Sequence, residues 1–130
     1  MDPLPAELFL CEDAAGTANV TKFGENLTMS MKEKMHTGAL YLPGDREILQ
    51  EQMQRLDRLY DFNMTRPSEL AKRQALLKEM FAEIGEDCYV EPPLYSNFGG
   101  GHVHFGRNIY ANFHLTLVDD THIYVGDYTM

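Results

Sequence analysis

A short pattern near the end of the chain repeats at an offset of 20 residues. Residues 104–108 match residues 124–128, and Val103 matches Ile123 immediately before them. Each copy runs through an apolar residue, a glycine, a polar residue and a turn residue. This is the unit of a parallel β-solenoid, in which each short strand stacks on its counterpart one coil later and glycine permits a tight corner. The repeat therefore predicts stacked short strands.

Two copies are fewer than the roughly three repeats that a solenoid normally needs to bury its core. The chain stops at Met130, inside the second copy. We therefore expect an open coil end that exposes apolar side chains and unpaired strand edges. The 130 residues are also expected to be too few for the whole of such an architecture, as if the solenoid were truncated.

Helical signals precede the repeat. Ser30 and Glu33 have the spacing of a capping box, and Pro43 with Gly44 should end this first helix by Leu42.

Two further helices are expected. The second helix is capped by Asp45 and ends near Asn63. The third helix starts at Arg66-Pro67, with Thr65 as its cap, and Gly85 ends it. Helical spacing predicts that their buried stripes are Leu49, Met53, Leu56 and Tyr60 in the second helix, then Leu70, Leu77, Phe81 and Ile84 in the third. Residues 88–91 are strand-like and are followed by two prolines.

The charge excludes some partners. The formal net charge is -9, from 20 acidic against 11 basic residues, which argues against nucleic acid and against an anionic membrane surface. Residues 1–28 hold five acidic residues and one basic residue, a net charge of -4, and show no sustained periodicity. We expect domains of residues 1–28 as a loosely ordered extension, 29–86 as a helical part and 87–130 as the solenoid.

The sequence predicts a cytoplasmic protein. No stretch approaches the ~20 apolar residues that span a bilayer. The apolar patch of residues 8–11 is too short for a signal peptide and lacks a basic flank before it. The two cysteines, Cys11 and Cys88, are too few for a disulfide framework and have no metal-type spacing, so we expect two reduced thiols.

A run of motifs begins with Met-His-Thr-Gly-Ala-Leu-Tyr-Leu-Pro at residues 35–43. It continues through residues 44–45, 62–63, 73–81, 84–86, 91–93, 109–113 and 118–120. These motifs resemble those of the maltose and galactoside O-acetyltransferases, which are hexapeptide-repeat acyltransferases, and the resemblance is nearly continuous from about Ser30 to Met130. Residues 1–28 are not covered.

The resemblance implies a fold of two parts, a small helical domain packed on a left-handed parallel β-helix. It also implies a homotrimer when full length, with active sites between subunits, that transfers an acetyl group from acetyl-CoA to a hydroxyl of a galactoside, maltose or glucose-type sugar. A histidine would act as general base, because a sugar alcohol is a poor nucleophile until a neighbour takes its proton.

This chain departs from that pattern at the base. In the family the histidine lies in a Gly-His-Pro loop, which would fall beyond Met130, and none of the five histidines here stands in that motif. Most coenzyme-contacting residues also belong to later coils. We therefore expect part of the acceptor pocket without a catalytic residue, and a 130-residue chain that is inactive alone.

Three residues match family positions at the acceptor end of the site. Asp120 could accept hydrogen bonds from sugar hydroxyls, or be a solvated turn acid like Asp119. Asn112 could donate to the acetyl carbonyl or its oxyanion, or belong to a turn or asparagine ladder. Tyr110 could offer its ring and hydroxyl to a sugar, or simply pack in the coil.

Two more substrate-binding candidates are less direct. Asn97 aligns with a polar position that contacts sugar in the family, although the following three glycines carry one extra residue. The family uses an acid after its first helix, where this chain has Pro43, and Asp45 two residues later could supply the carboxylate. Helix capping explains Asp45 equally well.

Other chemistries have weaker support. His102 and His104 would share a face of a strand and could bind zinc or copper, but no third ligand is near in sequence, so no metal is expected. The remaining histidines, His36, His114 and His122, are interpreted as surface or coil residues. No serine-hydrolase, phosphate-loop or C-x-x-C motif occurs. The alternative function is a non-catalytic module that caps or joins a solenoid partner.

Overall fold

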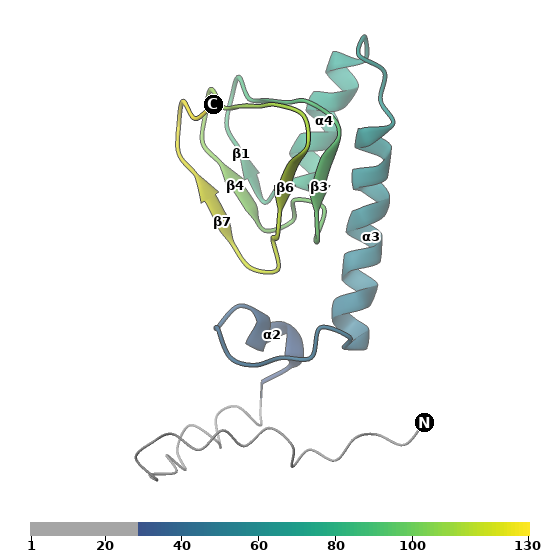
Figure 1. Cartoon of the computed structure of the whole chain (residues 1–130), viewed down its shortest axis with the longest axis vertical. Helices are drawn as coiled ribbons and strands as arrows, with labels where there is room; N and C mark the ends of the chain where they lie inside the picture. Colours follow the sequence, from purple (N-terminus) through teal and green to yellow (C-terminus); the bar gives the residue numbers. More distant parts are fainter. Residues whose placement is uncertain (1–28) are drawn as a thin grey trace.

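The computed structural model describes residues 29–130, a small helical region followed by short strands (Figure 1). The helices are α2 (Met31–Met35), α3 (Arg46–Asn63) and α4 (Leu70–Met80). The strands are β1 (Glu83–Ile84), β2 (Tyr89–Val90), β3 (Leu94–Ser96), β4 (Val103–Phe105), β5 (Tyr110–Ala111), β6 (Leu115–Leu117) and β7 (Ile123–Val125). The expectations for residues 1–28, including Cys11, lie outside the described residues.

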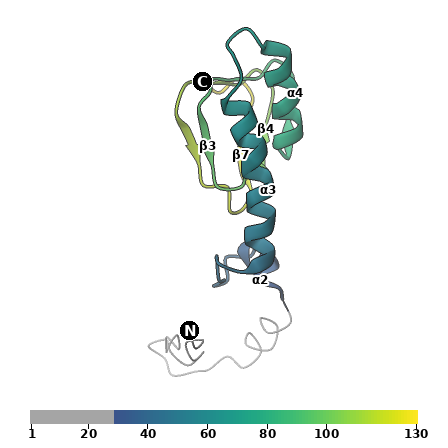
Figure 2. The same cartoon turned by 90° about the vertical axis from the view of Figure 1, so that its right-hand side faces the viewer.

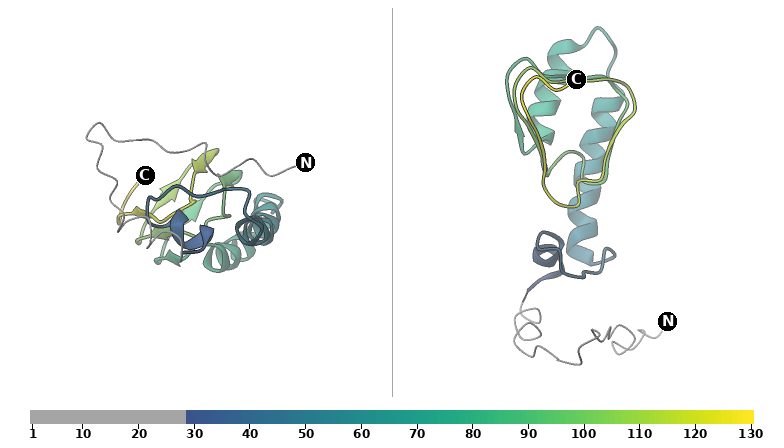
Figure 3. Two further views of the ribbon diagram at one scale, coloured as in Figure 1. Left: turned by 90° about the horizontal axis from the view of Figure 1, so that it is seen from below. Right: turned by 60° about the vertical axis from the view of Figure 1, so that its left-hand side comes forward.

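The strands form a β-helix of stacked coils. Strands β1 to β3 make the first coil, β4 to β6 the second, and β7 begins a third. All pairings are parallel, in the orders β1-β4-β7, β2-β5 and β3-β6. Val103 pairs with Ile123, which confirms the 20-residue repeat, and the coils lie over one another in Figure 3.

Each coil buries one side of its short strands. Val90, Leu94, Val103 and Phe105 point into a common core, which also takes in side chains of α3 and α4. Apolar side chains of the second coil and of the segment that begins with β7 are exposed to solvent. These are Phe113, Val118, Tyr124 and Tyr128.

The capping box of α2 is confirmed, because the Ser30 hydroxyl accepts from the Glu33 backbone N–H and the Glu33 carboxylate accepts from the Ser30 N–H. The helix is shorter than its capping signals suggested. It ends at Met35, and Gly38 then adopts a positive φ of 77°, a left-handed conformation that favours glycine. Residues 39–44 therefore run as a loop toward α3 rather than as helix.

The bounds of α3 are confirmed, but its predicted stripe is wrong except at Leu56, which is half-buried against the core. Asp45 accepts from the N–H groups of Glu47 and Ile48, and the helix ends at Asn63 as expected. The buried residues are Ile48, Leu59 and Phe62, whereas Leu49, Met53 and Tyr60 are exposed. The cause is the anchor at Asn63, whose side chain makes two hydrogen bonds to the backbone of Leu94 and so fixes which face meets the coil.

The expected start and end of the third helix are corrected. Helix α4 begins at Leu70, after a turn in which the Glu69 carboxylate accepts from the Arg66 N–H. Thr65 does not cap it, because its hydroxyl donates to the Phe62 carbonyl and accepts from Arg73.

The helix ends at Met80, and the chain then turns directly into the first coil. Leu77 and Phe81 are buried as predicted, but Leu70 is exposed and Ile84 belongs to β1.

Helices α3 and α4 lie side by side along one side of the coils, and α3 extends beyond the strands to reach α2 (Figure 2). Helix α2 thus sits below the turns of the coils, next to the second-coil turn that follows β6 (Figure 1). Within residues 29–130, no helix combines the length and apolar character needed to cross a membrane.

Candidate functional site

Asp120 lies where the helical region meets the second coil. Its carboxylate accepts 2.8 Å hydrogen bonds from the Tyr41 hydroxyl at Oδ2 and from the Asn97 amide at Oδ1. These partners come from the loop after α2 and the turn after β3, so three segments distant in sequence converge on one half-buried carboxylate. A carboxylate has about four lone-pair sites, which leaves Asp120 able to accept further hydrogen bonds.

Tyr41 is the residue that sequence reasoning missed. It lies 79 residues from Asp120, and the only signal was its place in the first family-like motif. The hydrogen bond to the carboxylate, together with partial burial, raises the pKa of the Tyr41 phenol. The phenol therefore stays protonated as the donor that holds Asp120 in place.

Asp119, expected to be a solvated turn acid, is fully buried. Its carboxylate accepts hydrogen bonds from the Ser96 hydroxyl at 2.5 Å and from the N–H groups of Phe98 and Gly100. Its backbone carbonyl accepts from His102. Asp119 thus fixes the loop of residues 96–101, and with it Asn97.

The glycines of that loop allow a close approach to the helical region. Gly99 and Gly100 have φ values of 59° and 87°, in the left-handed region. A Cβ at Gly100 would overlap the Phe81 ring, and one at Gly99 would overlap the backbone of Arg55 in α3. The glycine run is therefore a packing requirement next to Asn97.

Tyr110 stacks on Tyr89 of the preceding coil, with ring centroids 6.2 Å apart and an interplanar angle of 5°. Its hydroxyl donates to Glu91 at 3.5 Å, and the side chain is 39% exposed. Desolvation and the nearby Glu91 carboxylate raise the pKa of the Tyr110 phenol. The outer edge of this ring remains open to a ligand.

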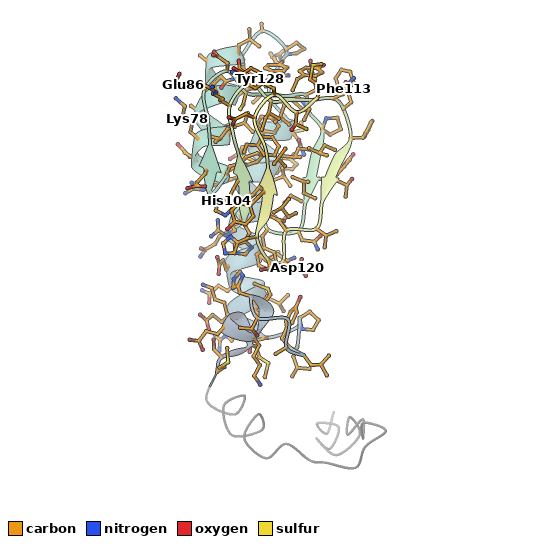
Figure 4. The ribbon with its side chains drawn as sticks, turned by 90° about the vertical axis from the view of Figure 1, so that its left-hand side faces the viewer. Lys78, Glu86, His104, Phe113, Asp120 and Tyr128 are labelled. Atoms are coloured by element: carbon orange, nitrogen blue, oxygen red, sulfur yellow. The ribbon has the colours of Figure 1, made fainter. Side chains whose placement is uncertain are left out.

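Asn112 is exposed and its Oδ1 accepts a 2.8 Å hydrogen bond from the Phe113 N–H, a local turn interaction. The amide group is thereby oriented with its Nδ2 as the free end for donation. Phe113 and Asp120 lie at opposite ends of the coil in Figure 4. Within a single copy of the protein, Asn112 and Asp120 therefore lie apart.

Asp45 is occupied as the N-cap of α3, where Oδ1 accepts from two backbone N–H groups. It shares no hydrogen bond with Asp120 or Asn97, and capping accounts for its carboxylate.

His102 and His104 flank the buried Val103, so both turn away from the coil core. His102 donates through Nδ1 to the Asp119 carbonyl, and His104 bonds to Glu83 and to His122, each at 2.8 Å. Among residues 29–130, no group of three or more candidate ligands has a geometry that could hold a metal ion. Cys88 is a buried free thiol.

A polar groove of about 530 Å³ lies between α3, α4 and the glycine loop. Several of its charged groups are paired, with Glu51 2.6 Å from Lys32 and 2.8 Å from Arg55, and Arg58 3.3 Å from Glu79. Burial opposes the charged form of Glu51, but Lys32 and Arg55 outweigh it and lower the pKa of the carboxyl. The groove contains none of the predicted site residues.

Comparison with known proteins places these residues in a family context. Residues 34–85 match the maltose acetyltransferase hexapeptide capping motif. The chain is 51% identical over 98 residues to the galactoside O-acetyltransferase of Lactococcus lactis subsp. lactis strain IL1403, an alignment that covers 75% of this chain and 47% of the relative.

Solved structures agree. A galactoside acetyltransferase in complex with coenzyme A matches with a TM-score of 0.71 and 41% identity, over 76% of this chain and 49% of that one. A maltose O-acetyltransferase from Clostridium difficile 630 matches with a TM-score of 0.74 and 30% identity, over 76% and 52%. The chain thus spans about half the length of the relatives it matches.

Proposed function

Because this chain belongs to the maltose and galactoside O-acetyltransferase family, we propose that it serves acetyl transfer from acetyl-CoA to a sugar hydroxyl and holds the acceptor side of the site. The observation that carries the proposal is the Asp120 carboxylate, positioned from two sides by Tyr41 and Asn97. The acceptor is a galactoside, maltose or a glucose-type sugar, and the working compartment is the cytoplasm.

Asp120 suits a sugar because an ionised carboxylate forms charge-assisted hydrogen bonds with hydroxyl groups. Tyr41 and Asn97 restrict its rotation, so little conformational entropy is lost when a hydroxyl binds to the remaining lone pairs. We assign Asn97 a second role as a direct contact, since its side chain is exposed beside the carboxylate. Asp45 keeps its role as the N-cap of α3.

Asn112 and Tyr110 are proposed to serve a second half of the site. The Asn112 Nδ2 would donate to the acetyl carbonyl, where negative charge develops in the transition state. Tyr110 would offer its exposed ring edge to the sugar. Because these residues lie away from Asp120 in one chain, we propose that the halves meet between copies of the protein in a homotrimer.

The general base is proposed to be a histidine that is not among residues 1–130. Acetyl transfer needs a group that takes the proton of the sugar hydroxyl, and a histidine in a Gly-His-Pro loop is the family's solution. None of the five histidines of this chain is followed by proline. We therefore expect negligible turnover from the 130-residue chain by itself.

A binding and a kinetic measurement test the proposal separately. In NMR spectra of the chain, a β-galactoside or maltose should shift the resonances of Asn97 and Asp120. Asp120→Asn should weaken this binding by about 10–100-fold, the range for a charged hydrogen-bond partner. Asp61→Asn, on the exposed surface of α3, is the matched control and should leave binding unchanged.

An equal loss of sugar binding in the two variants, or the lack of any sugar-induced shift at Asn97 and Asp120, would refute the acceptor assignment. Turnover of acetyl-CoA and galactoside near that of a complete family enzyme would instead refute the statement about the missing base.

The exposed apolar side chains of the second coil and of β7 favour a second candidate, a non-catalytic module that joins another solenoid. Val118 is 65% exposed and Tyr124 is 73% exposed. Light scattering over a range of concentrations tests it. A compact monomer that does not associate would exclude the module, and it would also count against the trimer proposed above.

A further inference from the structure

Four of the five histidines gather where α2 meets the second coil. His36 follows α2, His102 and His104 flank Val103 in β4, and His122 precedes β7. The His36 ring centroid lies 4.7 Å from that of His102 and 5.2 Å from that of His122. His122 lies 5.4 Å from His102 and 5.0 Å from His104. Figure 4 shows His104 on the part of the coils nearest α2.

Hydrogen bonds within this imidazole cluster (His36, His102, His104 and His122) are satisfied by neutral rings. His104 Nδ1 faces Glu83 Oε2, and since a carboxylate only accepts, this nitrogen donates. The neutral His104 ring then accepts through Nε2 from Nδ1 of His122, at 2.8 Å. Protonation of His104 at Nε2 would set two N–H groups against each other and break this bond, whereas a proton at Nε2 of His122 would leave it intact.

Protonation would also place positive charges about 5 Å apart in a partly buried setting, where repulsion is stronger than in bulk water. Burial, followed by the neighbouring His102 and His122 rings, lowers the pKa of His36. Glu51 opposes this effect and Lys32 adds to it.

Three carboxylates lie near the cluster, and each already has a hydrogen-bond or ion-pair partner. Glu83, from β1, accepts from His104 Nδ1 at 2.8 Å, and its side chain is 71% exposed. Glu51, from α3, already pairs with Lys32 and with Arg55. Asp120, from the second-coil turn, accepts from Tyr41 and Asn97.

The residues that the cluster holds in place, 31–42, have a small number of other attachments, among them the ion pair of Lys32 with Glu51 of α3. His36 Nδ1 bonds to the Thr121 hydroxyl at 3.1 Å, and Tyr41 bonds to Asp120. Met35 packs with Ile48 and Phe98 in a small core apart from that of the coils. Elements with so little buried surface detach at lower free-energy cost than the core.

We propose that the imidazole cluster is a proton-operated latch, which holds residues 31–42 against the second coil near neutral pH and releases them on acidification. The latch itself is independent of the function proposed above. Its consequence for the site rests on that function, because release would remove Tyr41 from Asp120 and so change the acceptor pocket.

The sign of the pH dependence follows from His36. Its pKa in the docked state lies below the ordinary value of 6.5, so the docked state binds fewer protons than the released one. Docking is therefore fully stabilised above about pH 6.5 and is lost as the pH falls below it. For each additional proton that residues 31–42 and the cluster take up on release, the equilibrium constant for docking falls by a further factor of about ten per pH unit.

NMR spectra of the complete 130-residue chain between pH 7.5 and pH 5 test the latch. Ring resonances report the titration of each histidine, and backbone resonances report the docking of residues 31–42. The expected result is that residues 31–42 move to released positions together with the titration of His36, while β4 and β6 keep theirs. Docking that persists at pH 5, or a loss shared equally by all strands, would overturn the proposal.

Two matched variants identify the cause. His36→Asn keeps a polar atom near the position of Nδ1 for Thr121 but removes the titrating ring, so the pH dependence should become shallower by about tenfold per unit. His114→Asn, an exposed histidine stacked on Tyr95 outside the cluster, should behave as wild type. Should His36→Asn fail to dock at pH 7.5, His122→Gln replaces it, because it removes one of the rings that lower the pKa of His36 and should make the pH dependence of docking shallower.

An unchanged pH dependence in the cluster variants would refute the latch. Titration with Zn²⁺ supplies a further check, in which the latch predicts no saturable binding. If Zn²⁺ bound saturably at the cluster and abolished the pH dependence of docking, the cluster would be a metal site and the latch proposal would be rejected. Neither sugar nor acetyl-CoA is used, so these outcomes are independent of the proposed function.

Discussion

The Ser96 hydroxyl donates a 2.5 Å hydrogen bond to the Asp119 carboxylate, 23 residues away, and so joins the end of β3 to the turn after β6. The same carboxylate binds two backbone N–H groups of the glycine loop. A buried acid thus fixes the turn beside the half-buried acid, Asp120, that we propose binds the acceptor.

Asp119→Asn should lower the free energy of unfolding by about 2–4 kcal/mol, because one buried acceptor is replaced by an amide that cannot accept at both ends. Asp120→Asn, at the half-buried neighbouring position, should cost less than about 1 kcal/mol. Urea unfolding followed by circular dichroism measures both values. Equal losses would contradict the assignment of Asp119 as the structural member.

Gly100→Ala should destabilise the protein by about 1–3 kcal/mol, because φ is 87° and the new Cβ would overlap the Phe81 ring. Gly44→Ala is the control, since nothing lies within 4 Å of its Cβ position. That change should fall within about 0.5 kcal/mol of wild type. Thermal unfolding of the two variants provides the comparison, and similar midpoints would argue against the close approach.

Met53→Ala should change the free energy of unfolding by less than about 0.5 kcal/mol, because the side chain is 65% exposed on α3. Leu59→Ala, on the buried face of the same helix, should cost about 2–5 kcal/mol. Chemical unfolding of both variants decides which face of α3 is the core face. A larger loss of unfolding free energy in Met53→Ala than in Leu59→Ala would show that the buried face of α3 is the one expected from the sequence.

Glu51→Gln should reduce the acid sensitivity of the protein. Lys32 and Arg55 hold the pKa of Glu51 below its ordinary value of 4.5 in the folded state. Its stabilising contribution is therefore present above about pH 4.5 and is lost as the pH falls through the lowered pKa.

At pH 7 that contribution should be about 1 kcal/mol or less, as for partly exposed ion pairs. The stability difference between wild type and Glu51→Gln should accordingly shrink between pH 6 and pH 3. Glu86→Gln, an exposed acid at the start of the coils, serves as the comparison. A difference that stays constant with pH would show that the ion pair is not its source.

Local signals along the chain predicted the caps of two helices. The Ser30 and Glu33 capping box and the Asp45 cap are recognisable because each satisfies backbone donors within a few residues. The start of α4 was misplaced because the Glu69 carboxylate bonds to the Arg66 N–H and holds those residues in a turn.

The candidate site was only partly predictable. Asp120 and Asn97 were named from the family resemblance, and the structure brings them into contact. Tyr110 and Asn112 were named on the same ground but lie in another part of the coil. Tyr41 was not named, since nothing in a tyrosine 79 residues before Asp120 indicates that the two will meet.

The sequence by itself determined the caps of α2 and α3 and the 20-residue register of β4 and β7, because these are encoded by neighbouring residues or by direct repetition. The tertiary structure decided the buried face of α3, the burial of Asp119 and the meeting of four histidines. Each of these depends on which distant backbone groups lie opposite a side chain. Spacing along the chain sets local geometry, whereas burial and pairing follow from the stacking of the coils on the helices.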